Sequence, residues 1–106
     1  MERTAFIGLF GENPVLKVLD FLIVHEEFDY SMKDIAKFSG IGYATLKLFW
    51  KRLEKAGIVI KTRAVGKAKM FRLNTANPAV KKFRDFYWQV TKLQIDKEIF
   101  EKPSIH

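Results

Sequence analysis

The feature that most limits the fold of this chain is a single stretch with the residue pattern of a β-hairpin. Residues 58–63 are apolar and β-branched before they alternate, and residues 69–73 alternate throughout. The residues between them, 64–68, include Gly66, which can adopt the positive φ that a tight hairpin loop requires. Because the rest of the chain has helical periodicity, the predicted fold is mainly α-helical with a small β-hairpin.

Short sequence signals mark where the helices begin and end. Asn-Pro pairs at 13–14 and 77–78 each place a helix cap before a proline that suits the first turn. A Ser-x-x-Asp pattern from Ser31 is a variant of the capping box, and Gly40 and Gly57 stand where left-handed residues end helices. The predicted helices cover residues 14 to about 25, about eight residues up to Ser39, 43 to 56, and 78 to about 97, with an extended segment at 28–30.

A short helix, a glycine-containing turn and a longer helix, followed at once by the hairpin, predict a winged helix-turn-helix with an added C-terminal helix. The length of 106 residues suits a single domain over 1–106. Within that domain, residues 14–76 are the predicted winged-helix core and residues 77–98 the C-terminal helix.

Composition argues against several kinds of functional site. The chain has no cysteine and two histidines, so thiolate metal sites and histidine-dependent triads are not expected. The carboxylates Asp29, Asp34 and Asp85 lack metal-ligand spacing, and there is no glycine-rich phosphate loop. We therefore expect no enzyme, no metal and no cofactor. The longest apolar run, 21–24, is too short for a membrane helix and the start lacks a signal peptide, so a cytoplasmic protein outside the membrane is expected.

Charge is distributed unevenly along the chain, whose formal net charge is +7. Residues 31–84 hold fourteen lysines and arginines against two acidic residues, whereas both ends are net acidic. A basic centre of this kind is typical of proteins that bind a polyanion such as nucleic acid. A solvated basic face explains the charge equally well when charge is the only information.

The predicted helix at 43–56 separates apolar from basic side chains at 100° per residue. Its apolar arc is expected to pack on the preceding helices and holds Leu46, Phe49, Trp50, Leu53 and Ala56. The opposite arc suits a helix that enters the DNA major groove, where lysine can donate to guanine or phosphate and apolar groups can touch thymine methyls. The residues of this helix predicted to contact DNA are Tyr43, Ala44, Lys47, Leu48, Lys51 and Lys55. A solvated helix face is the alternative.

The hairpin is basic as well, with no acidic residue between 58 and 73. Alternation is expected to send Phe71 and Leu73 to one face of the strand and their neighbours to the other. Lys67 flanks the predicted tip, where a wing meets the phosphate backbone or an adjacent minor groove. The hairpin residues predicted to contact DNA are Arg63, Lys67 and Lys69. A solvated hairpin is the alternative.

Two motifs carry a family resemblance, and they read Ser31-x-x-Asp34-Ile35-Ala36-x-x-x-Gly40-Ile41-x-x-x-Thr45-Leu46 and Leu53-Glu54-Lys55-Ala56-Gly57-Ile58-Val59. Over roughly residues 14–85 the chain resembles the winged helix-turn-helix transcriptional regulators of the MarR/ArsR type. Its wing, Lys61-Thr62-Arg63-x-x-Gly66-Lys67-Ala68-Lys69, looks like that of the archaeal members. The resemblance implies DNA binding and a dimer formed by terminal helices. Because the cysteine pairs of metal-sensing ArsR proteins are missing, it does not imply metal sensing.

The predicted C-terminal helix carries two apolar ridges. One holds Ala79, Val80, Phe83, Phe86, Tyr87, Val90 and Leu93, and the other holds Trp88 and Ile95. A second ridge suggests a surface buried by a partner subunit. The residues predicted at a homodimer interface are Phe83, Phe86, Tyr87, Trp88, Val90 and Leu93. A larger monomeric core and an aromatic effector pocket are the alternatives, and no residue cluster identifies an effector.

Together these features predict a sequence-specific regulator of transcription that binds double-stranded DNA as a homodimer on a pseudo-palindromic operator. The alternative is a winged-helix interaction module in a transcription or replication assembly, with only nonspecific affinity for nucleic acid. A steep preference for one duplex sequence would separate the two.

Overall fold

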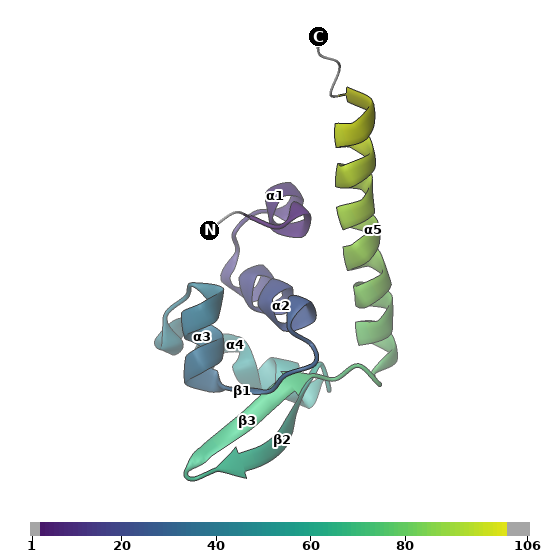
Figure 1. The fold of residues 1–106 in the computed structure, drawn as a ribbon. Coiled ribbons are helices and arrows are strands. Elements are labelled where there is room, and N and C mark those ends of the chain that lie inside the picture. Colours follow the sequence, from purple (N-terminus) through teal and green to yellow (C-terminus); the bar gives the residue numbers. More distant parts are fainter. Residues whose placement is uncertain (1–2, 102–106) are drawn as a thin grey trace.

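The computed structural model describes residues 3–101 and arranges them as five helices and a three-stranded antiparallel sheet (Figure 1). In chain order the elements are α1 (Ala5–Phe10), α2 (Pro14–Val24), β1 (Tyr30–Ser31), α3 (Met32–Ser39), α4 (Tyr43–Lys55), β2 (Val59–Val65), β3 (Ala68–Leu73) and α5 (Pro78–Glu101). The mainly helical fold with a hairpin and a C-terminal helix is therefore confirmed. The sequence signals predict no helix over the segment that forms α1.

Local hydrogen bonds explain where the helices begin and end. The side chain of Asn13 accepts a hydrogen bond from the backbone N–H of Val15 at 2.8 Å, at the start of α2. Ser31 caps α3 by accepting one from the N–H of Asp34 at 3.1 Å. α3 ends at Gly40, whose φ of 76° strains residues that have a side chain. The turn after Gly40 leads directly into α4, which gives the predicted helix-turn-helix.

The core lies where α2, α3 and α4 meet the inner face of the sheet. Each of these elements contributes side chains that are at most 2% exposed, and they include Val18, Leu22, Ile35, Leu46, Trp50, Val59 and Leu73. The rings of Trp50 and Phe71 meet edge to face at 5.2 Å and join α4 to β3. The hairpin is thereby anchored on the helix that precedes it.

The sheet contains one strand more than the predicted hairpin. Its order is β1–β3–β2, and β1 pairs antiparallel with β3 through Tyr30 opposite Phe71. The hairpin strands pair as far as Val65 and Ala68, so its tip is shorter than the predicted loop at 64–68. Phe71 and Leu73 are buried on the inner face, as alternation predicts.

Two asparagines fasten the end of α4 to the start of α5. Asn74 and Asn77 each donate from Nδ2 to the carbonyl oxygen of Gly57 at 2.9 Å. Asn77 also donates to the carbonyl oxygen of Ala56 at 3.1 Å. Gly57 has a φ of 73°, and a Cβ at this position would lie 3.2 Å from Asn77 Nδ2. The joint therefore favours glycine and holds the two helix ends together.

α5 runs along one side of the molecule, and its C-terminal half extends past α1 (Figure 1). The described chain is correspondingly elongated, with extents of 57, 28 and 22 Å. α1 packs on α5 through Phe6, whose ring lies 5.2 Å from that of Tyr87. Asp20 of α2 accepts hydrogen bonds on Oδ1 from the hydroxyls of Thr4, at 2.6 Å, and Tyr87, at 2.7 Å. Burial and this carboxylate raise the pKa of Tyr87 above its usual value.

Within residues 3–101, none of the helices combines the length and the apolar character needed to cross a lipid bilayer.

Candidate nucleic-acid interface

The two faces of α4 divide as its sequence predicts, with one exception. Leu46, Phe49 and Trp50 are buried, and Leu53 is partly buried against the same core. Ala56 is exposed, because α4 ends at Lys55 and Ala56 forms its C-cap rather than its inner face. All six residues of this helix predicted to contact DNA lie on the exposed side, and they are Tyr43, Ala44, Lys47, Leu48, Lys51 and Lys55.

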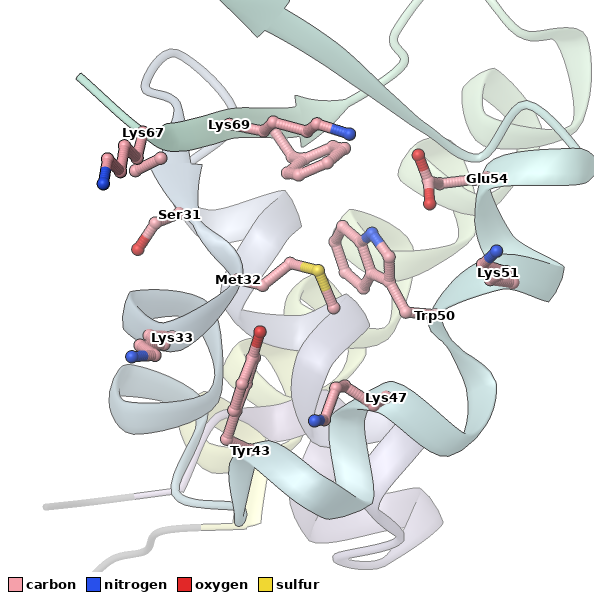
Figure 2. A pocket seen from close by; sticks show the side chains of 12 residues that line it. Ser31, Met32, Lys33, Tyr43, Lys47, Trp50, Lys51, Glu54, Lys67 and Lys69 are labelled. Atoms are coloured by element: carbon pink, nitrogen blue, oxygen red, sulfur yellow. The ribbon is translucent and has the colours of Figure 1, made fainter. Parts of the chain in front are cut away.

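A groove of about 770 Å³ lies between α4 and the hairpin (Figure 2). We call it the basic groove, and its lining residues are Ser31, Met32, Lys33, Tyr43, Lys47, Trp50, Lys51, Glu54, Lys67, Ala68, Lys69 and Phe71. Five of these are lysines, contributed by α3, α4 and the hairpin, against one glutamate. The fold thus converts charges that are spread over 37 positions of sequence, Lys33 to Lys69, into one positive surface.

Tyr43, at the N-terminus of α4, lies close to two of these lysines. The Nζ atom of Lys47 is 4.8 Å from the centre of the Tyr43 ring, and that of Lys33 is 5.9 Å from it. Ammonium groups at these distances are attracted to the face of the ring. Tyr43 therefore keeps the two charges beside its ring in the lining of the groove, in the positions visible in Figure 2.

The structure places four of the predicted lysine contacts in this groove and leaves other predicted residues outside it. The four are Lys47, Lys51, Lys67 and Lys69, and Tyr43 lies beside them. Ala44, Leu48 and Lys55 are exposed on α4 but do not line the groove. Sequence reasoning missed Lys33 of α3 as a residue that lines this groove. The available signal was its position in the first turn of the helix that precedes α4.

Arg63 does not line the basic groove, and the hairpin contains a β-bulge next to it. Regular alternation would put residues 61 and 63 on the same face of β2. The register shifts by one residue between them, so that Lys61 pairs with Phe71 whereas Arg63 pairs with Met70. Phe71 faces the groove, and its neighbour Met70 faces the opposite side. Arg63 therefore shares with Met70 what we call the outer face of the hairpin.

On that outer face Arg63 forms an ion pair with Asp29. Arg63 donates from Nε to Oδ2 of Asp29 at 2.9 Å and from Nη2 to Oδ1 at 3.1 Å. The hydroxyl of Thr62, the bulge residue, also donates to Oδ2. The Arg63 hydrogen bonds, followed by that of Thr62, lower the pKa of Asp29 from 3.8 to about 2. Asp29 likewise raises the pKa of Arg63.

The residues predicted to form a dimer interface do not share one surface. Tyr87 and Val90 are 1% and 4% exposed within the single chain, and Phe83 packs against the same core. These three are inward-facing residues, which corrects the prediction for Tyr87 and Val90. Phe86, Trp88 and Leu93 are 49%, 46% and 65% exposed. Helix periodicity grouped Phe86 and Leu93 with Tyr87 and Val90 in one ridge, whereas the structure exposes the first two and buries the other two.

Among the described residues, no group of three or more histidines, aspartates and glutamates is arranged to hold a metal ion.

Solved structures of three proteins have a similar fold. A mutant of Lactococcus lactis ZitR in its apo form matches with a TM-score of 0.62 and 21% identity, over 92% of this chain and 75% of its own. MepR, a transcription regulator of the Staphylococcus aureus multidrug efflux pump MepA, has a TM-score of 0.56 and 18% identity, over 76% of this chain and 60% of its own. The adhesin competence repressor AdcR of Streptococcus pyogenes has a TM-score of 0.58 and 17% identity, over 83% of this chain and 66% of its own.

These likenesses establish a winged helix-turn-helix fold, in which α3 and α4 form the helix-turn-helix and β2 and β3 the wing. The chain spans between 60% and 75% of the length of these three proteins. No protein-family model matches the chain, and no curated protein matches it in sequence.

Proposed function

We propose that this protein is a transcriptional regulator that binds double-stranded DNA through α4 and the wing. The observation that carries the proposal is the basic groove, in which lysines of α4 and of the hairpin line one surface. Two of the proteins with a similar fold support it, because MepR is a transcription regulator and AdcR is a repressor. α4 enters the major groove of the duplex, and the wing lies along the neighbouring backbone.

Each predicted contact except Arg63 has a role in this arrangement. Lys47 and Lys51, one turn apart on α4, face base edges of the major groove. Lys67 and Lys69 bind phosphates beside it, and Lys55 binds a phosphate near the end of α4. Tyr43, Ala44 and Leu48 supply the exposed surface that meets the bases. No residue in this set requires a cofactor, a metal or a catalytic step, and we expect the protein to act in the cytoplasm.

The proposal includes a symmetric homodimer formed through α5. Phe86, Trp88 and Leu93 leave apolar surface exposed on this helix. Phe10 of α1, which is 45% exposed, extends that surface, since its ring lies 5.7 Å from the ring of Phe86. A two-fold axis through the patch formed by Phe10, Phe86 and Leu93 buries the same residues of both subunits. It also places two copies of α4 on a pseudo-palindromic operator whose half-sites are about one helical turn apart.

Selection of bound duplexes from a random pool tests the proposal. We expect a consensus with two-fold symmetry. Lys47→Ala with Lys51→Ala should then weaken binding to that consensus by on the order of 1–3 kcal/mol for each base-reading lysine that is removed. Lys81→Ala with Lys92→Ala is the matched control, because it removes the same charge from exposed positions of α5 that lie outside the basic groove.

Unchanged affinity in the α4 double variant would contradict the proposed orientation. A selection that returns no consensus, while duplexes of any sequence still bind, would instead favour the alternative of an interaction module with nonspecific nucleic-acid affinity.

A further inference from the structure

The ion pair between Asp29 and Arg63 occupies an arginine that lies near the tip of the hairpin. Arg63 lies two residues before Val65, the last paired residue of β2. Its side chain is 63% exposed, whereas that of Asp29 is 16% exposed. The Asp29 side chain is thus mostly covered by its surroundings, whereas the Arg63 side chain is mostly exposed to solvent. An arginine at this point of a wing is well placed to reach a DNA backbone.

Asp29 offers Arg63 the same kind of bond that a phosphate would. Guanidinium binds carboxylate and phosphate alike through two parallel hydrogen bonds, and Asp29 already receives two. Thr62 fixes the carboxylate by a third. A phosphate that takes Arg63 must therefore displace an equivalent partner that is already in position. It must also approach the negative charge of Asp29, which Arg63 no longer neutralises once the pair opens.

The sequence positions of the two residues explain why this pairing is specific to the folded chain. They are 34 residues apart, and Asp29 precedes β1, the short strand beside β3. The three-stranded sheet brings the segment before β1 across β3 to β2. The bulge at Thr62 turns Arg63 to the outer face, where Asp29 lies.

We propose that Asp29 is a positioning residue that withholds Arg63 from DNA and thereby lowers the electrostatic affinity of the wing. The inference rests on the proposed DNA binding and deepens it, since it assigns a role to a residue outside the basic groove. With Asp29 in place, the pair is neutral and contributes no phosphate contact. Without the carboxylate charge, Arg63 becomes an additional phosphate-binding group beside Lys67 and Lys69.

The test compares charge-matched variants on a duplex of random sequence, by fluorescence anisotropy from about 0.05 to about 0.3 M salt. Asp29→Asn keeps the shape of the side chain but removes its charge. We expect the slope of log K against log salt to steepen by about 0.9, the value for one further phosphate contact. At about 0.1 M salt that slope corresponds to roughly eightfold tighter binding.

Two further variants test whether the effect of Asp29→Asn comes from the release of Arg63 or only from the change in net charge. Glu27→Gln removes an equal charge from the same outer surface, where Glu27 and Asp29 line one shallow cavity. It should leave the slope unchanged. Asp29→Asn with Arg63→Ala removes both members of the pair and keeps the local charge neutral. This double variant should bind like the wild type, with the same slope and affinity.

The outcomes distinguish this inference from the proposed function. A wild type that binds no duplex overturns the proposed function. A wild type that binds, with an Asp29→Asn variant of unchanged slope, overturns the role of Asp29 alone. The role is also overturned if the double variant binds clearly more weakly than the wild type, because Arg63 would then contact DNA with Asp29 present. If Asp29→Asn does not fold, the Nε–H NMR signal of Arg63 in the wild type decides. It should not shift when duplex is added, and a shift overturns the inference.

Discussion

Leu48 is the most exposed large apolar side chain among the described residues, at 81%. It lies on the arc of α4 that we place in the major groove. The only apolar group that B-DNA presents there is the methyl group of thymine, or of a methylated cytosine. An exposed leucine in this position therefore gains from burial against that methyl and from no other feature of the bases.

Replacing thymine by uracil removes this methyl and leaves every hydrogen-bonding group unchanged. We expect one such replacement in each half-site of the selected operator to weaken binding by about 0.8 kcal/mol, or roughly fourfold in Kd, for each methyl group that is removed. Titration of each uracil-containing operator would measure it. The Leu48→Ala variant should be indifferent to the same replacement. A wild type that tolerates uracil at every thymine of the operator would contradict a methyl contact.

Asp29 also makes the stability of the fold depend on pH. Its pKa in the folded chain, about 2, is below the ordinary value of 3.8. Ionised Asp29 therefore stabilises the folded state above pH 3.8, and this contribution is lost as the pH falls toward 2. We expect the difference in Tm between the wild type and Asp29→Asn to be complete above about pH 5 and to disappear near pH 2. Thermal unfolding followed by circular dichroism measures it, and a difference that is constant with pH would contradict the assignment.

At the scale of elements, Asp20 connects three helices through two hydroxyl groups. It lies on α2 and receives hydrogen bonds from Thr4, the cap of α1, and from Tyr87 of α5. Tyr87→Phe keeps the buried ring but removes one of these bonds to a charged acceptor. We expect the free energy of unfolding in urea to fall by about 1.5–3 kcal/mol.

The control is Tyr43→Phe, which alters the exposed tyrosine of α4 and should change the free energy of unfolding by less than about 0.5 kcal/mol. If Tyr87→Phe is as stable as this control, the hydrogen bond to Asp20 does not hold α5 in place.

Elements that depend on adjacent residues were predictable, and elements that depend on distant ones were not. Ser31 and Gly40 delimit α3 through bonds within a few positions, so the helix-turn-helix followed from the sequence. β1 has two residues, too few for an alternating pattern, and exists because β3 pairs with it. The bulge at Thr62 likewise leaves no signal in the strand's own composition. With this bulge, Arg63 pairs with Met70 and binds Asp29 on the outer face of the hairpin.

At the scale of the whole molecule, the exposed apolar side chains of α5 predict self-association. Phe86→Ser with Leu93→Ser should give monomers in sedimentation at micromolar concentration, because each large apolar side chain buried in the dimer contributes roughly 1.5–3 kcal/mol. Operator binding should weaken in parallel. Phe38→Ser is the matched control, since Phe38 of α3 is 49% exposed, as is Phe86, and should leave the dimer intact. A wild-type monomer that binds its operator with full affinity would contradict this interface.

The joint at Gly57 has a consequence for which DNA sites the protein can use. Because Asn74 and Asn77 both bind the end of α4 at the point where α5 begins, the reading helix and the helix proposed for dimerisation cannot pivot independently. In a dimer formed through α5, the angle around the duplex axis between the two α4 helices is therefore fixed by the structure of each protomer. Operators whose half-sites are displaced by half a turn, about five base pairs, would present their second half-site on the wrong side of the duplex, whatever their base sequence.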